Sequence, residues 1–344
     1  MKLIHLGDLH FSKFYKGNLP IEIREKITRD IWENFLSVIS YLEKSKIDLM
    51  LLAGDLFERE YFSLSQMNKF LFELEKIKIP VFIVCGNHDF LDGNSIYKKV
   101  KLPENVHLFG DEFSYVDLEN LKTRVFGISY NREYFKEILP EPQIKEDYNN
   151  ILLIHAAIED GNFLKLEEDY AKKFDYVAMG HVHKRGKVFA NAYYCGSLEP
   201  MSFKETGDHG FIEVDLDSQE IHFVNSQVKH FQILDIEIDN EKNPEEVLGQ
   251  ISKNINDKDL YRIRLRGRYR ESTYLLSYLE NNLRAFYFEI ENYLLPSYSI
   301  EDLLQKNDNT LLGKYINSFN REDALEMDGL RLGIKYLMEA SHEN

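Results

Sequence analysis

Five short polar segments, each directly following a short apolar run, constrain this 344-residue sequence most strongly. Short apolar runs bounded by glycine and polar residues are typical of buried β-strands. If the runs form parallel strands, their polar ends meet at one edge of a sheet, where α/β proteins bind ligands. The segments are Asp8-Leu9-His10, Gly54-Asp55, Gly86-Asn87-His88-Asp89, His155 and Gly180-His181-Val182-His183, and they follow the runs Lys2–Leu6, Leu49–Ala53, Val81–Val84, Ile151–Ile154 and Tyr176–Met179.

Seven side chains in these segments are carboxylate, amide or imidazole ligands for metal ions. One ion rarely binds so many carboxylates and imidazoles. Two ions that share a bridging carboxylate would need a ligand set of this size. Oxygen and nitrogen ligands favour Mn, Fe, Zn or Co as the bound metal. The absence of thiolate ligands excludes a structural zinc site built from cysteines. Two such ions about 3.5–4 Å apart stabilise both the attacking and the leaving oxygen of a displacement at phosphorus. We therefore predict a two-metal phosphoesterase centre in Asp8, His10, Asp55, Asn87, His155, His181 and His183.

The formal net charge of −16 argues against a protein that coats nucleic acid through its surface. Nonspecific affinity for nucleic acid comes mainly from Lys and Arg, so an acidic nuclease needs a local positive feature or a basic partner. Two divalent ions beside Asp8 and Asp55 would provide such a feature. The two cysteines, Cys85 and Cys195, lie in apolar runs, and the longest apolar stretches are far shorter than a membrane span. We predict a cytoplasmic protein that does not contact a membrane.

The chain alternates strand and helix patterns up to about residue 230. Apolar residues recur at helical spacing over Ile21–Lys44 and Ser63–Lys76, and Ser63 is a candidate N-cap. Strands that alternate with helices predict an α/β core. Residues 231–300 then read as strand, helix, strand and helix, and helical spacing dominates from residue 301 onward. We predict three parts, which are 1–230, 231–300 and 301–344.

The five segments resemble the signature of calcineurin-like metallophosphoesterases. Three stretches are similar to the SbcD/YhaO-type DNA-repair exonucleases, whose counterpart elsewhere is the meiotic-recombination-eleven nuclease. They are HLGDLHF from residue 5, LLAGDLFE over 51–58 and YCGSLEPMSF over 194–203. The resemblance implies an α/β fold with a β-sandwich core flanked by helices, a small α+β capping domain that contacts DNA and a helical C-terminal tail. It also implies two divalent ions, with Mn favoured over Fe, Zn and Co.

The resemblance implies a role for each residue of the motifs. The implied ligands are Asp8, His10 and His183 for one ion, Asn87, His155 and His181 for the other, and Asp55 as the bridge. His88 would contact the scissile phosphate and help to protonate the leaving oxygen, oriented by Asp89 or by another acid. Residue 58 is glutamate, where some members of the family carry histidine. This difference leaves the role of position 58 open.

Arginines occupy every second position from residue 262 to residue 270. On a β-strand, alternate residues share one face, so the guanidinium groups would form a stripe. Such a stripe fits a DNA sugar-phosphate track through Arg262, Arg264, Arg266 and Arg268. The alternative is a solvated face whose arginines pair with some of the many acidic residues. We expect Gly267 to form a bulge that breaks the register.

The last helical segment places Leu330, Ile334 and Leu337 on one face. In the resembled family, a helical segment beyond the capping domain docks on an SMC-like ATPase, and an exposed apolar face suits binding in a groove. The alternative is that this face packs on the protein's own core. The oligomeric state stays open, with a homodimer as one assembly that fits, since nucleases that bind paired DNA ends are often two-fold symmetric.

Together these observations predict a metal-dependent phosphodiesterase that hydrolyses DNA as an exonuclease or end-processing nuclease in DNA repair, with an SMC-like ATPase as partner. Two alternatives stay open. One is a phosphodiesterase or phosphatase for nucleotides or other small substrates. The other is a metal-stabilised scaffold without catalysis, which the presence of His88 disfavours.

Overall fold

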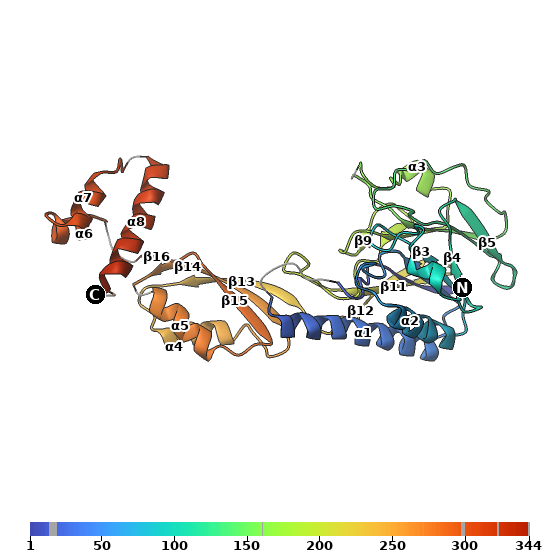
Figure 1. Ribbon diagram of the computed structural model, residues 1–344, viewed down its shortest axis with the longest axis horizontal. Helices are drawn as coiled ribbons and strands as arrows, with labels where there is room; N and C mark the ends of the chain where they lie inside the picture. The colour runs from blue at the N-terminus through green and yellow to red at the C-terminus, as the bar shows by residue number, and fades with distance from the viewer. Residues whose placement is uncertain (14–18, 160, 271, 297–299, 322, 343–344) are drawn as a thin grey trace. The chain divides into compact units, whose positions relative to one another are not determined.

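The computed structural model describes residues 1–344 except 14–18, 160, 271, 297–299, 322 and 343–344. The chain divides into two compact units, residues 1–230 and residues 231–344 (Figure 1). The first unit contains two six-stranded sheets and the helices that pack on them. The predicted α/β class is confirmed.

The first sheet contains the first three of the predicted strands. In spatial order its strands are β12 (Glu220–Asn225), β11 (Gly210–Asp215), β1 (Lys2–Leu6), β2 (Leu49–Ala53), β3 (Val81–Val84) and β4 (Val106–Leu108). The four strands from β1 to β4 run parallel, whereas β11 pairs antiparallel with both β1 and β12. The parallel arrangement brings the carboxyl ends of β1, β2 and β3 to one edge of the sheet.

The second sheet contains the other two predicted strands. In spatial order its strands are β5 (Ser114–Leu118), β6 (Thr123–Ile128), β7 (Asn149–His155), β8 (Tyr176–Gly180), β10 (Ala192–Tyr194) and β9 (Gly186–Lys187). β6, β7, β8 and β10 run parallel, and the edge strands β5 and β9 are antiparallel to their neighbours. The carboxyl ends of β7, at His155, and of β8, just before His181, therefore also lie at one edge.

Alternating side chains explain why the two sheets form a sandwich. Leu51 of β2 and Leu153 of β7 belong to one buried apolar cluster that joins the sheets. Their neighbours Leu52 and Ile154 point the other way, into the clusters between each sheet and its outer cover. Because both faces of β2, β3 and β8 are buried, these strands are apolar along their whole length and do not alternate with polar residues.

Two helices cover the outer face of the first sheet. α1 spans Ile21–Lys44, as predicted, and α2 spans Leu64–Lys76. Ser63 caps α2 in a reciprocal capping box with Gln66. Three short helical segments complete the first unit, namely the 3₁₀ turns Ile96–Lys99 and Glu119–Leu121 and the helix α3 (Glu168–Ala171).

The second unit begins with a small sheet covered by two helices. Its strands are β13 (Phe231–Ile238), β14 (Leu260–Tyr269), β15 (Tyr287–Asn292) and β16 (Leu295–Pro296), and its first helices are α4 (Pro244–Ser252) and α5 (Ser272–Asn282). All described pairings in this sheet are parallel. α4 starts where the sequence predicts, with Asn243 and Glu246 forming a capping box.

Three further helices end the chain: α6 (Ile300–Asn307), α7 (Leu311–Asn317) and α8 (Ala324–His342). Leu330 and Ile334 of α8 are fully buried with Leu303 of α6 and Ile316 of α7. This face therefore packs on neighbouring helices of the same chain, which was the alternative to partner docking. Among the described helices, none is both long enough and apolar enough to cross a bilayer.

A buried carboxyl group anchors the 196–209 loop to α1. One oxygen of Glu199 accepts hydrogen bonds from the Asn34 side chain and from the backbone N–H of Val228, which lies 2.8 Å away. Burial raises the pKa of Glu199 to about 7, and Asp30 on the same helix adds to the increase. The buried carboxyl therefore holds a proton at pH values at which an unfolded chain would release it.

This shift predicts that Glu199→Gln stabilises the protein at pH 8 relative to the wild type. The folded state binds the proton more tightly, so the wild type loses stability as pH rises from about 4.5 to 7, by at most about 1.4 kcal/mol per pH unit. The glutamine does not titrate. Urea unfolding at pH 5 and pH 8 measures the effect, and a difference between variant and wild type that stays constant with pH would contradict it.

Candidate metal centre

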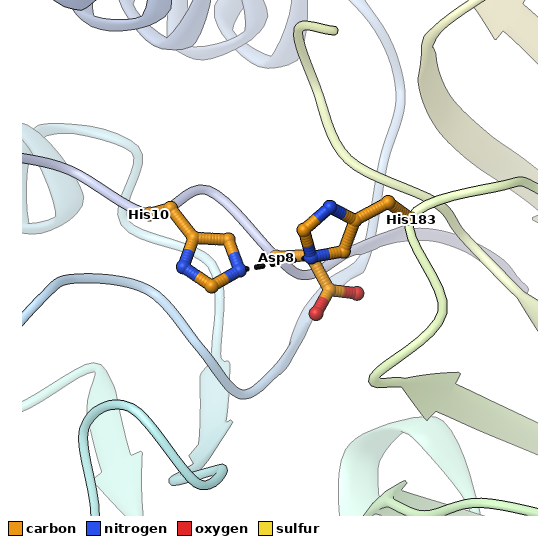
Figure 2. Close-up of side chains that lie close together, drawn as sticks. All are labelled: Asp8, His10 and His183. Carbon is orange, nitrogen blue, oxygen red and sulfur yellow. Dashed lines mark hydrogen bonds between the residues drawn. The ribbon is translucent and has the colours of Figure 1, made fainter. Parts of the chain in front are cut away.

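Three of the predicted metal ligands meet between the carboxyl ends of β1 and β8. Ligand atoms of Asp8, His10 and His183 all lie within 4.8 Å of one another (Figure 2). The Nε2 atoms of the two imidazoles are 3.0 Å apart. Asp8 and His10 are buried, and His183 is half-buried. The two histidines come from loops 173 residues apart in the sequence, so only the fold brings them together.

A second group surrounds Asp55 at the end of β2. Asp8, Asp55 and His155 also place ligand atoms within 4.8 Å of one another, and so do His10, Asp55 and His88. The Nε2 atom of His155 lies 3.1 Å from Oδ1 of Asn87. Asp55 therefore has ligand atoms of both His10 and His155 within 4.8 Å of its own.

His181 approaches this centre from the side. Its ring centroid lies 5.2 Å from that of His155, edge to face, and 4.5 Å from that of Phe163. Its backbone N–H donates to both carboxylate oxygens of Asp8, each at 3.1 Å. All seven predicted ligand residues thus lie at adjoining strand ends.

The hydrogen bonds of the imidazoles fit a metal ion better than a protein-only network. Nδ1 of His155 donates to the carbonyl of Ala53 at 2.9 Å, which leaves an acceptor at Nε2. That acceptor faces Asn87 Oδ1 and, at 3.5 Å, Asp55 Oδ2, which are themselves acceptors. Acceptors that face one another in a buried site are stabilised by a cation between them. The donor set is oxygen and imidazole, as Mn, Fe, Zn or Co prefers.

Backbone strain gathers at the same residues. Asp8, His10, Asp55 and His181 have φ angles of 49°, 46°, 51° and 103°, and they make up four of the nine non-glycine residues with positive φ in the described chain. Such conformations are costly for residues with a Cβ and collect at functional sites. The chain therefore adopts strained turns where the candidate ligands point inward.

Glycine is required where two of the ligand loops approach each other. A Cβ on Gly86 would lie 2.3 Å from Asp55 Oδ1, and a Cβ on Gly180 would lie 2.0 Å from the carbonyl oxygen of Ala53. Any side chain at either position would push the loops apart. This close packing explains why glycine precedes Asn87 and His181.

The protonation states of the buried ligands bear on metal binding. Burial raises the pKa of Asp8 to about 6 and lowers the pKa of His10 to about 4. Burial would also raise the pKa of Asp55, but the nearby His155 and other imidazoles outweigh it and lower that pKa. An ionised Asp55 and a neutral His10 are the forms that bind a metal ion.

Glu58 joins two of the histidines through its two carboxylate oxygens. Nδ1 of His10 donates to Oε1 at 2.9 Å, and Nδ1 of His88 donates to Oε2 at 2.8 Å. Burial alone would lower the pKa of His88, but the bond to Glu58 and the charge of Asp55 raise it to about 9. The carboxyl group that orients His88 is therefore Glu58, at the position whose role the sequence left open.

Asp89 has a different position from the one considered in the sequence. Its carboxylate accepts the backbone N–H groups of Asp55 at 3.1 Å, Leu56 at 2.9 Å and Gly86 at 2.7 Å. It therefore fixes the loops after β2 and β3 to each other. Glu205 is a further acid that sequence reasoning missed, since it follows His183 by 22 residues and no motif includes it.

A cleft of about 620 Å³ opens beside this centre. His88 and Asn87 line it together with Glu58 and Glu205, and the side chains of Lys13 and Arg59 add positive charge. His88 is 40% exposed, so its imidazole can reach a molecule in the cleft. The cleft gives a phosphate ester access to His88 and to Asn87, the one candidate ligand among its lining residues.

The predicted arginine stripe lies on β14 in the second unit, and its arginines have acidic neighbours. The guanidinium groups of Arg262 and Arg264 pair with Glu289 and Glu291 on β15, and Arg266 pairs with Asp235 on β13. This is the alternative arrangement, in which the arginines pair with carboxylates of adjacent strands. The side chains of Arg266 and Arg268 are exposed.

The expected bulge at Gly267 is wrong. Gly267 pairs with Ile238, and Arg268 pairs in turn with Leu295, so the register continues through this position. Glycine is needed here for a different reason, because φ is 102° and a Cβ would lie 2.2 Å from the carbonyl oxygen of Ile238.

Curated proteins to which this chain is similar include three relatives of modest identity. The uncharacterized metallophosphoesterase YhaO of Bacillus subtilis (strain 168) is 27% identical over 246 residues, which cover 65% of this chain and 59% of YhaO. The DNA double-strand break repair protein Mre11 of Methanococcus maripaludis is 25% identical over 293 residues, 75% of each chain. A component of the nuclease SbcCD of Staphylococcus epidermidis is 25% identical over 264 residues, 64% of this chain and 67% of that protein. This chain thus spans less than two thirds of the length of YhaO.

The family comparison covers the same region as the centre. Residues 1–185 match the family model of the calcineurin-like phosphoesterases, and this range includes all seven candidate ligands and His88. It is more than half of the chain. The chain therefore belongs to the calcineurin-like phosphoesterase family.

Proposed function

We propose that the protein is a two-metal phosphodiesterase that hydrolyses DNA, as an exonuclease or end-processing nuclease of DNA repair. The observation that carries this proposal is that seven oxygen and imidazole side chains lie at adjoining strand ends, five of them in groups whose ligand atoms lie within 4.8 Å of one another, beside a cleft that His88 lines. The relatives named as a DNA double-strand break repair protein and as part of a nuclease support DNA as the substrate.

Each ligand has a proposed place in the centre. Asp8, His10 and His183 would hold one ion, Asn87, His155 and His181 the other, and Asp55 would bridge them. When bound, two divalent ions would supply an activated water and neutralise charge on the phosphate. We propose Mn as the physiological metal.

The protein's own residues would position the substrate and move the proton. Glu58 holds the His88 ring through Nδ1, so Nε2 of His88 is free to face the phosphate in the cleft. The hydrogen bond to Glu58 raises the pKa of His88 and so favours the protonated imidazole. His88 would then donate its Nε2 proton to the leaving sugar oxygen, as a general acid.

We predict that Glu58→Gln loses activity, because this one substitution weakens the hydrogen bonds that orient both His10 and His88. Glutamine keeps the size of the side chain but removes the charge that both Nδ1 atoms contact. Removing such a partner of a metal ligand typically costs about 10–100-fold in affinity or activity. Steady-state kinetics and Mn titration measure the loss. Glu75→Gln, an exposed acid on α2, is the control that should behave as wild type.

An ATPase is the partner that we propose for this chain. The name of the SbcCD relative describes one component of a larger nuclease. Leu325, Leu332 and Tyr336 of α8 are strongly exposed and lie on one face at helical spacing, so they offer an apolar surface for such a partner. Arg266 and Arg268 are the arginines of the stripe that we propose for contact with DNA phosphates.

A second candidate function is hydrolysis of a nucleotide or another small phosphodiester. The cleft volume of about 620 Å³ lies within the range of small-molecule sites. The net charge of −16 also favours a small substrate over a long polyanion.

The experiment that separates these functions compares two substrates with the Mn-loaded protein. End-labelled linear DNA and bis(p-nitrophenyl) phosphate are incubated with the wild type, with and without a chelator. Chelator-sensitive shortening of the DNA is the expected result. Cleavage of the ester without any cleavage of DNA would favour the small-substrate function, and two bound ions without activity on either would favour a scaffold.

A further inference from the structure

Glu205 contacts the candidate ligand His183 on the side away from the centre. Nδ1 of His183 donates to Oε1 of Glu205 at 3.0 Å. Because an ionised carboxylate can only accept, this bond places a proton on Nδ1, and in the neutral imidazole Nε2 is then an acceptor. That Nε2 faces the Nε2 of His10, 3.0 Å away (Figure 2).

Glu205 is itself held at two further points. Its second carboxylate oxygen accepts the backbone N–H of Met201 at 2.9 Å. Its backbone carbonyl accepts from Nε2 of His209 at 3.1 Å. A carboxylate bound through both oxygens has little freedom to rotate, so it can fix the direction of the imidazole that it contacts.

The 196–209 loop that carries Glu205 is fastened beside His183 and to α1. The backbone N–H of Ser197 donates to the carbonyl of His183 at 3.0 Å. Glu199, two residues on, is buried and bonded to Asn34 of α1. The loop thus connects both the backbone and the ring of His183 to the helix that covers the first sheet.

Glu205 also differs from the other carboxyl groups of its loop. Asp208, three residues later, is exposed and pairs only with Arg185 among the described residues, at 3.3 Å. Glu199 points to α1 and contacts no histidine in the described chain. The contact with His183 is therefore specific to one acid of the loop.

We propose that Glu205 is a positioning residue, which holds the His183 imidazole so that Nε2 points to the ion shared with Asp8 and His10. The inference rests on the proposed metal centre and adds a residue outside its seven ligands. Glu205 acts on one side of the facing imidazole pair as Glu58 acts on the other side. Without Glu205 the ring could rotate or carry its proton on Nε2, and the affinity of the site for the ion would then fall.

The test is a Mn²⁺ titration of the full chain by isothermal titration calorimetry. We expect the wild type to bind two ions and Glu205→Ala to bind one of them about 10–100-fold more weakly. The other ion should keep its affinity. Glu205→Gln keeps the shape of the side chain and should give a smaller loss at the same site, so it decides the question if the alanine variant does not fold.

Asp208→Asn is the matched control, and it should bind both ions like the wild type. Wild-type affinity for both ions in folded Glu205→Ala or Glu205→Gln would overturn the inference and leave the metal centre intact. A lower thermal midpoint of the metal-free variant with unchanged Mn²⁺ affinity would also overturn it, since it would mean a purely structural role. If the wild type binds no Mn²⁺, the proposed centre fails and the inference fails with it.

Discussion

Replacement of His88 by asparagine is expected to reduce DNA cleavage about 10²–10⁴-fold, the usual contribution of a general acid. The substitution removes the Nε2 that would protonate the leaving oxygen. It should leave the metal centre intact, because none of the seven proposed ligands is changed. Gel assays on end-labelled DNA measure the activity, and elemental analysis of the same preparation should give two Mn ions per chain.

The leaving group provides a sharper form of this test. A sugar oxygen needs a proton as it departs, whereas nitrophenolate is a weak base and leaves without one. His88→Asn should therefore lose far less activity on bis(p-nitrophenyl) phosphate than on DNA. His222→Asn, an exposed histidine on β12, should match the wild type on both substrates. Near-wild-type cleavage of DNA with two bound ions would exclude this role for His88.

Asp55→Asn is expected to lose at least one of the two ions and, with it, nearly all activity. Asparagine is close in size and can still accept the backbone N–H of His88, which lies 2.8 Å from Oδ1 in the wild type. It cannot provide the negative charge of a bridging carboxylate. The expected Mn content is one ion or none per chain after gel filtration, with an unchanged circular dichroism spectrum.

Asp111→Asn serves as the control for Asp55→Asn. Asp111 is exposed and accepts a hydrogen bond from Asn131 at 3.0 Å. This variant should keep two ions. Two ions retained by Asp55→Asn would reject Asp55 as the bridge, whatever the effect on turnover.

Local sequence patterns predicted most of the first unit. The run over Leu49–Ala53 is β2 and the helical spacing over Ile21–Lys44 is α1, with the same bounds. These elements are apolar on the faces that the fold buries, so their periodicity carries the information. β7 begins at Asn149, two residues before the predicted run, because Asn149 and Asn150 still pair with β6.

The partners of the ligands could not be predicted in the same way. Glu58 contacts His10 across 48 residues of sequence, and Glu205 contacts His183 across 22 residues. Nothing in the sequence distinguishes these two acids from the others among the 58 aspartates and glutamates of the chain. The pairing of Arg264 with Glu291 depends on which strands become neighbours. Such contacts depend on the tertiary fold, and the spacing of residues along the sequence does not predict them.

The most direct test of the two-metal centre is an anomalous diffraction map from crystals grown with Mn²⁺. Two peaks about 3.5–4 Å apart are predicted. The first should lie among Asp8, His10 and His183, the second among Asn87, His155 and His181, with Asp55 between them. A single peak, or two peaks away from these side chains, would contradict the account.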